Sequence, residues 1–137
     1  MTPATSGVED TGAAEHALVI GSNRRRAANM RHARRRLQEH FEVMDCAPAR
    51  RTRDGDGARY LNAAVRVRSA LPPTALRTIL HAIEDETGRA RGDAAVTLDI
   101  DLVASRDAQG RVQAHKPDDL QRDYVRELLA QIGFDPT

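Results

Sequence analysis

The 137-residue sequence predicts an α+β domain: a four-stranded, mainly antiparallel sheet with helices on one face and an extra helix at the C-terminus. Strand-like and helix-like apolar patterns alternate along the chain, and the third and fourth strand-like segments carry polar side chains at every second position. That alternation is typical of antiparallel strands with one buried face. The length suits one domain, expected at residues 16–137 after a disordered tail at residues 1–15.

The first half of the chain is expected to supply a strand, a helix and a second strand. His16–Ile20 is an apolar run closed by Gly21, as in a buried strand. Residues 41–46 alternate as a strand does, and residues 47–59, rich in Arg, Asp and Gly, are expected to form a loop. The helix is expected at residues 24–40, where apolar side chains recur at helical spacing at Met30, Ala33, Leu37 and Phe41.

The second half adds two strands and two helices. Tyr60–Arg68 has a clean period of two, which predicts a strand with one apolar face. Pro72 and Pro73 open a helix that Gly88 ends, residues 97–102 form the next strand, and the last helix runs from Pro117 to Gly133. This order of elements predicts a ferredoxin-like sandwich. Four polar residues would then share the face opposite the helices: Tyr60, Asn62, Asp99 and Asp101.

Two acids in the segment Thr97–Leu102 carry the functional argument. In a strand, Leu98, Ile100 and Leu102 would face the core while Asp99 and Asp101 point the other way, with Cα atoms about 6.6 Å apart. Carboxylates at that separation can hold a divalent cation together with phosphate oxygens. The spacing therefore predicts magnesium-assisted phosphoryl chemistry, and the alternative is a solvated strand face that carries two acids.

Composition excludes several other classes of protein. The net charge is +1, and the arginine clusters lack aromatic neighbours on which bases could stack, which argues for an arginine-rich composition and against nucleic-acid binding. A single cysteine, Cys46, excludes an intrachain disulfide and indicates a reducing compartment. No apolar run could span a membrane, so we expect a cytoplasmic protein. We also expect a monomer. Ser22 lacks a base partner and the histidines lack metal-ligand spacing, so hydrolase and zinc functions rank lower.

Four sequence pieces resemble the 6-hydroxymethyl-7,8-dihydropterin pyrophosphokinase family, whose members transfer a pyrophosphoryl group from ATP to a pterin alcohol in folate biosynthesis and release AMP. They occur in the family's order across most of residues 17–102. The family has a ferredoxin-like fold. The pieces are Gly21-Ser22-Asn23, Tyr60-Leu61-Asn62-Ala63-Ala64-Val65, Ile83-Glu84 with Gly88-Arg89-Ala90-Arg91, and Thr97-Leu98-Asp99-Ile100-Asp101.

The resemblance implies a role for each matching residue. Asp99 and Asp101 correspond to the aspartates that hold two magnesium ions, and Arg89 and Arg91 to catalytic arginines near the phosphates of ATP. The other nucleotide residues are Glu84, His115 and Arg122; the acceptor residues are Asn62, Tyr60, Thr52 and Tyr124. The partners are small molecules only. Taken alone, Glu84 and Arg89 could be a helix-end ion pair, a contact that contributes little at a surface.

The chain also departs from the family pattern. Where the family has Trp-Gly-Pro-Arg before the strand acids, this chain has Asp93-Ala94-Ala95-Val96, and it contains no tryptophan. The ring that closes over the pterin and the second loop arginine are therefore missing, so we expect weakened activity. Three hypotheses follow: a divergent pyrophosphokinase, a paralogue that uses the Mg-ATP site on another alcohol, and a non-catalytic nucleotide-binding domain.

Overall fold

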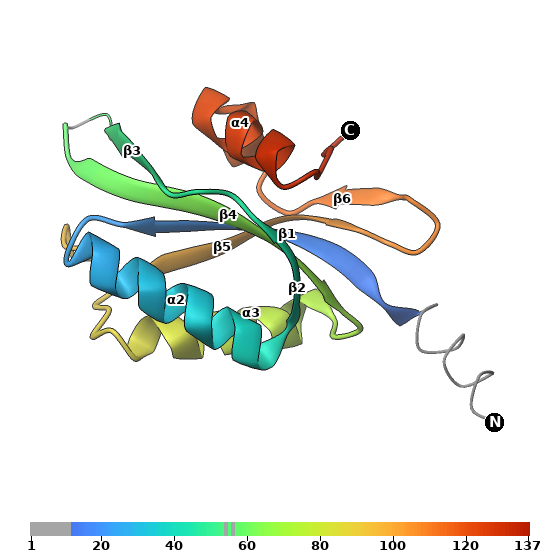
Figure 1. Ribbon diagram of the computed structural model, residues 1–137, viewed down its shortest axis with the longest axis horizontal. Helices are drawn as coiled ribbons and strands as arrows, with labels where there is room; N and C mark the ends of the chain where they lie inside the picture. The colour runs from blue at the N-terminus through green and yellow to red at the C-terminus, as the bar shows by residue number, and fades with distance from the viewer. Residues whose placement is uncertain (1–11, 54, 56) are drawn as a thin grey trace.

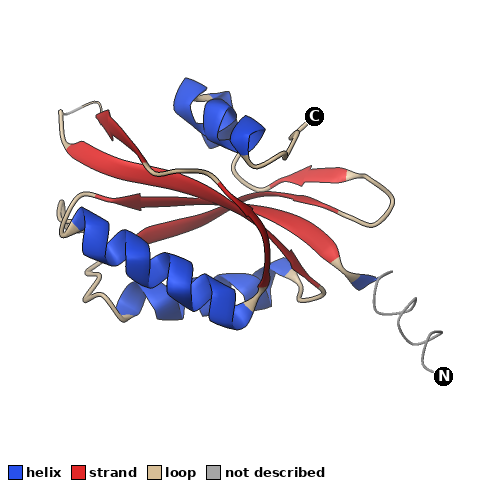
Figure 2. Ribbon diagram, in the orientation of Figure 1, coloured by secondary structure: helices blue, strands red, loops and turns tan. Residues whose placement is uncertain are grey.

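The structure, a computed structural model, describes residues 12–53, 55 and 57–137 (Figure 1). One antiparallel sheet forms the centre, with helices on both of its faces (Figure 2). The elements in chain order are β1 (Ala14–Ser22), α2 (Arg26–His40), β2 (Glu42–Cys46), β3 (Arg50–Arg53), β4 (Arg59–Ser69), α3 (Pro73–Asp85), β5 (Asp99–Arg106), β6 (Val112–Ala114), a short 3-10 helix (Asp119–Gln121) and α4 (Asp123–Gln131).

The sheet has six strands in the order β2-β4-β1-β5-β6, with β3 also paired to β4. The α+β class is confirmed, but the expected four strands were too few. β4 is longer than β2, which pairs only with Val65–Arg68, and β3 pairs with the free half of β4 at Arg59–Asn62. β3 lies inside the segment expected to be a loop, because its sequence Arg-Arg-Thr-Arg has no apolar alternation.

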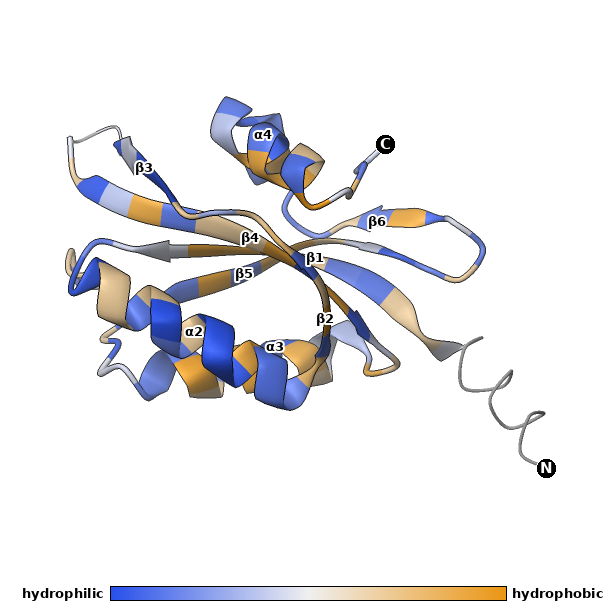
Figure 3. Cartoon of the chain, in the orientation of Figure 1, coloured by the Kyte–Doolittle hydropathy of each residue, from blue (hydrophilic) through white to orange (hydrophobic). Residues whose placement is uncertain are grey.

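Two hydrophobic cores lie on opposite faces of the sheet. Helices α2 and α3 cover one face, where they bury residues such as Leu18, Val65 and Ile100 (Figures 1 and 3). The last helix, α4, lies on the other face and buries Val19 and Ala64 with its own Leu128 and Leu129. The face expected to be open is therefore covered in part, because the apolar stripe of α4 needs a partner surface. The uncovered part carries the polar residues described below.

Element ends differ modestly from the expected ones. β1 begins at Ala14, two residues inside the expected tail; residues 1–11 of that tail lie outside the described residues. The last helix is divided, because a 3-10 turn at Asp119–Gln121 precedes α4. Among the residues that the structure describes, no helix has the length and apolar character needed to cross a membrane.

Candidate active site

Asp99 and Asp101 lie on the same face of β5, as their spacing predicted. The alternating residues Leu98, Ile100 and Leu102 are buried in the core beneath α2 and α3, so the two carboxylates project from the opposite face. Asn62 of β4 lies on that face too, because its neighbours Leu61 and Ala63 pack into the helix-covered core. The sheet therefore brings a pair of acids and a carboxamide to one surface.

Gly21 of β1 separates these two polar groups. In the sheet register, Gly21 pairs with Asn62 on one side and with Asp99 on the other. A Cβ atom at position 21 would lie 3.0 Å from Oδ1 of Asn62 and 3.7 Å from Cδ2 of Tyr60. The absence of a side chain at Gly21 therefore leaves the surface between Asn62 and Asp99 open.

A cavity of about 170 Å³ adjoins Asn62. The side chain of Asn62 is buried and donates a hydrogen bond to Oγ1 of Thr52 on the edge strand β3. Arg122, expected at the nucleotide, lies here with the residues expected at the acceptor; Arg53 was not anticipated, although it follows Thr52 directly. The lining residues are Thr52, Arg53, Tyr60, Asn62, Arg122 and Tyr124. We call this cavity the acceptor pocket.

The acid pair concentrates negative charge that Lys116 compensates only in part. Burial, followed by repulsion from Asp101 and Glu84, raises the pKa of Asp99 to about 7. Lys116, the single lysine of the chain, lies with its Nζ 2.8 Å from Oδ1 of Asp101, a partner that the strand pattern could not identify. Two hard oxygen donors that still repel each other beside one lysine fit a divalent cation such as Mg²⁺.

Protein ligands for such an ion would be few. Within residues 12–53, 55 and 57–137, no group of three or more His, Cys, Asp or Glu side chains is placed to bind one metal ion. An ion held by Asp99 and Asp101 would therefore complete its coordination with water or with the oxygens of a ligand, as Mg²⁺ does when it bridges carboxylates and phosphates. The donor set suits an ion that arrives with a phosphorylated substrate.

Glu84 is a structural residue as well as a candidate nucleotide ligand. Its carboxylate is buried, accepts the backbone N–H of Ile100 at 2.7 Å and pairs with Arg91, which also donates to Asp85 at 2.6 Å. The ion pair considered from the sequence joined Glu84 to Arg89; the structure pairs Glu84 with Arg91 instead and adds the bond to Ile100. In contrast, Nε of Arg89 is buried without a hydrogen-bond partner in the described part of the chain.

The side chains of Ser22 and Asn23 fix the loop that leads into β5. Ser22 donates from Oγ to the carbonyl of Thr97 at 2.7 Å. Asn23 forms three bonds to the same loop: its amide donates to Ala94, its Oδ1 accepts from the N–H of Val96, and its own N–H donates to the carbonyl of Val96. The segment Asp93–Val96, which stands where the family has Trp-Gly-Pro-Arg, is thus attached to the end of β1.

His115 lies apart from the acceptor pocket. Its Nε2 is 2.9 Å from Oγ of Ser105, which is itself 2.7 Å from Nδ1 of the buried His16. Burial lowers the pKa of both histidines, and the charge of Arg77 on α3 lowers that of His115 further. His115 and Arg122 were both expected at the nucleotide, but only Arg122 lines the acceptor pocket.

The fold and these side chains define an α+β domain that presents paired carboxylates beside a polar cavity. Residues 17–133 match the family model described as 7,8-dihydro-6-hydroxymethylpterin-pyrophosphokinase, and the chain belongs to that family. It is a family of pyrophosphokinases of folate biosynthesis that use ATP and Mg²⁺. A search of curated proteins finds no match to this chain.

Proposed function

We propose that this protein transfers a pyrophosphoryl group from Mg-ATP to the hydroxyl of 6-hydroxymethyl-7,8-dihydropterin and releases AMP. The observation that carries the proposal is the position of Asp99 and Asp101 on the same open surface as the acceptor pocket, across Gly21 from Asn62. Phosphoryl groups are transferred with little covalent help from protein, by positioning the nucleophile and neutralising charge. The nucleophile belongs to the acceptor, so the chain needs no activated serine or cysteine.

Asp99 and Asp101 would hold the magnesium, and two ions are expected. When bound, Mg²⁺ would neutralise the charge of the phosphate oxygens. Lys116 lies within the same charge cluster, and its contact with Asp101 keeps a cation beside the acids. The protein's own contribution is to fix the two carboxylates on a rigid strand, where they cannot move apart on binding.

The acceptor pocket would hold the pterin. Asn62, fixed by its bond to Thr52, presents an amide oxygen that can accept hydrogen bonds from the heterocycle. Tyr60 and Tyr124 supply the aromatic surface of the pocket. At about 170 Å³ the pocket is smaller than the 300 Å³ or more that is typical of sites for drug-sized ligands, which suits one end of a small bicyclic ring.

The nucleotide would contact the loop after α3. Arg89, assigned to the phosphates by the family resemblance, would donate to a phosphate oxygen; its Nε lacks a partner within the described residues. Arg91 already pairs with Glu84 and Asp85, so its use on phosphate would require those pairs to open. Glu84 and His115 would also contact the nucleotide.

A divergent acceptor is the second candidate. The acceptor pocket contains Arg53 and Arg122, and the chain offers no tryptophan to cover a neutral ring. Both features fit a paralogue that uses the same Mg-ATP site on another alcohol. A non-catalytic domain is disfavoured, because the carboxylates of Asp99 and Asp101 repel each other and a site that binds no metal has nothing to offset this repulsion.

Binding calorimetry combined with an AMP-release assay tests the proposal. Mg²⁺ and α,β-methylene-ATP should bind first, and 6-hydroxymethyl-7,8-dihydropterin should bind the resulting complex. AMP should appear only when ATP and the pterin are both present. Nucleotide binding with no response to the pterin would favour the paralogue, and failure to bind the nucleotide would favour the non-catalytic domain.

A further inference from the structure

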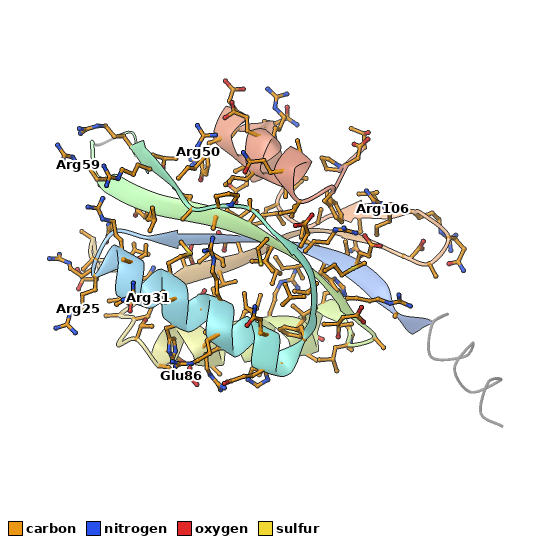
Figure 4. All side chains as sticks on the ribbon, in the orientation of Figure 1. Arg25, Arg31, Arg50, Arg59, Glu86 and Arg106 are labelled. Atoms are coloured by element: carbon orange, nitrogen blue, oxygen red, sulfur yellow. The ribbon has the colours of Figure 1, made fainter. Side chains whose placement is uncertain are left out.

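Lys116 places a positive charge directly on one of the two candidate metal ligands. Its Nζ lies 2.8 Å from Oδ1 of Asp101, and the charge of Asp99 acts on the same ammonium. Arg25 and Arg59, in contrast, project into solvent at one end of the molecule (Figure 4). Lys116 is therefore a component of the charge cluster at the candidate site and is distinct from the arginine-rich surface.

The backbone of Lys116 is held on both sides. Its N–H donates to the carbonyl of Val103 on β5 at 3.2 Å, and its own carbonyl accepts the N–H of Leu120 at 3.2 Å. Pro117 follows, and a residue before proline is restricted to extended backbone conformations. Any movement of the ammonium must therefore come from the side chain, whose four-carbon stem is flexible.

The side chain of Lys116 can leave Asp101 at little cost. It is 45 % exposed and that of Asp101 is 25 % exposed, so water reaches both partners of the ion pair. Ion pairs this accessible contribute little to stability, because solvent screens the attraction and the long lysine side chain loses entropy when it is held. The contact is thus a resting position that a stronger ligand of Asp101 can replace.

This contact conflicts with the metal that Asp101 is proposed to hold. An ammonium and a divalent cation on one carboxylate repel each other strongly at such short distances. A divalent cation that arrives alone offers the displaced ammonium of Lys116 no new partner. A cation that arrives with a nucleotide brings phosphate oxygens, which accept charge-assisted hydrogen bonds from lysine. Lys116 should therefore oppose the binding of the metal alone and favour the binding of the metal with the nucleotide.

We propose that Lys116 is a mobile cation of the active site: its ammonium pairs with Asp101 in the free protein and moves to the nucleotide phosphates when a metal–nucleotide complex binds. This inference rests on the proposed function and adds a phosphate-binding residue to it. By linkage, the same side chain increases the factor by which nucleotide strengthens metal binding, so the two ligands bind together. Lys116 also brings a cation to the phosphates in a chain that lacks the second loop arginine.

Binding of Mn²⁺ to the full chain, alone and as its complex with α,β-methylene-ATP, tests the inference. Free Mn²⁺ is measured by its electron paramagnetic resonance signal, and the complex is titrated by calorimetry. Lys116→Met keeps the aliphatic stem and removes the charge. This variant should bind Mn²⁺ alone at least about fivefold more tightly than the parent and should bind the Mn–nucleotide complex about tenfold more weakly.

Two further variants separate this role from a structural one. Lys116→Arg keeps the positive charge, so in both titrations it should lie closer to the parent than Lys116→Met does. Arg111→Gln removes one charge from a side chain that is 78 % exposed and paired with Asp107, and it should change neither affinity. An unchanged urea midpoint shows that each variant is folded, and Lys116→Gln replaces Lys116→Met if the latter unfolds.

The outcomes separate the two proposals. A contact that only supports the local structure would weaken both affinities or neither. Changes of the same sign in Lys116→Met, or no change, would therefore overturn the inference and leave the proposed function intact, provided that the parent binds the Mn–nucleotide complex. Absence of binding of Mn²⁺ alone by both parent and variant would also overturn the inference. Failure of the parent to bind the complex would remove the proposed function and the inference with it.

Discussion

Asn62 and Asp99 face the same side of the sheet with one glycine between them. Each pairs directly with Gly21, Asn62 from β4 and Asp99 from β5. Two strand spacings place their Cα atoms about 10 Å apart. A bicyclic acceptor held at Asn62 could therefore direct a short hydroxymethyl arm toward the acids, and Gly21 forms the floor between the two ends.

Replacing Gly21 by Ala should weaken acceptor binding selectively. The new methyl group would lie 3.0 Å from Oδ1 of Asn62, so the amide must move from its place. Overpacking of this kind costs about 1–3 kcal/mol, and we expect pterin affinity to fall about tenfold or more. Mg-ATP affinity should change less than about twofold, because the added atom would contact Asn62 and Tyr60 and not Asp99.

Calorimetry with each ligand in turn measures the effect of Gly21→Ala. Gly12→Ala is the matched control, because a Cβ there meets no atom within 4 Å. If the variant bound the pterin as tightly as the parent, Asn62 would have no part in holding the acceptor.

Removing both carboxylates should abolish Mg-dependent nucleotide binding. In Asp99→Ala combined with Asp101→Ala, the metal loses both protein ligands and the phosphate charge is left uncompensated. We expect Mg-ATP affinity to fall at least about 100-fold and the response to EDTA to disappear. Equilibrium titration with and without Mg²⁺ gives both values.

The control for this change removes two exposed carboxylates elsewhere, Glu39 on α2 and Glu127 on α4. It should bind Mg-ATP as the parent does. Undiminished Mg-ATP binding by the Asp99/Asp101 double variant would contradict the metal assignment.

His16 should make the fold less stable in mild acid. Burial lowers its pKa below the ordinary value of 6.5, so the unfolded chain binds the proton more readily than the folded chain. The contribution of His16 is complete above pH 6.5 and is lost as the pH falls toward the folded-state pKa. His115, whose pKa is also lowered, acts in the same direction.

Urea titrations between pH 5 and 7.5 test the role of His16. The slope of unfolding free energy against pH should become shallower in His16→Gln, by at most about 1.4 kcal/mol per pH unit for one proton. His81→Gln, which changes an exposed histidine of α3, should leave the slope as it is in the parent. An unchanged slope in His16→Gln would show that other groups cause the acid sensitivity.

The apolar periodicity of the sequence predicted the parts of the fold that the cores determine. Val65 and Ile100 could be assigned to the face under α2 and α3 because a one-residue shift would move them to the opposite face, beside polar residues such as Arg66 and Asp99. β3 could not be predicted in this way, since an edge strand of arginines is held by backbone pairing with β4 and not by a hydrophobic face. Its position depends on the length of β4, which only the folded sheet reveals.

The positions of the two acids in the candidate site were predictable from the strand pattern, but their contacts with the rest of the chain were not. Asp99 and Asp101 share a face because side chains two positions apart in a strand point to the same side of the sheet. The bond from Glu84 to the N–H of Ile100 and the contact of Lys116 with Asp101 join residues 16 and 15 positions apart, and neither distance follows a local period. Such contacts depend on how α3 and the segment after β6 pack against β5.

The short loop before β5 should reduce catalysis more than nucleotide binding. Asn23 fixes this loop through Ala94 and Val96, so the segment that stands in for the family's lid is bonded to the end of β1. It also lacks the tryptophan that would cover the pterin and the second arginine that would reach the phosphates. Closing loops exclude water and complete the charge-neutralising set, and neither step is required for the first binding of ATP.

We therefore expect ordinary Mg-ATP affinity together with weak or undetectable turnover of 6-hydroxymethyl-7,8-dihydropterin. A missing aromatic partner forfeits about 1–3 kcal/mol of stacking, or about one to two decades in acceptor affinity. The absent arginine should lower the rate further and leave Arg89 and Arg91 as the cations of this loop. AMP release should be measured beside a complete member of the family under the same conditions. Equal values of kcat/KM would show that the covering loop is dispensable, whereas normal turnover that collapses in Asn23→Ala would show that the short loop itself completes the site.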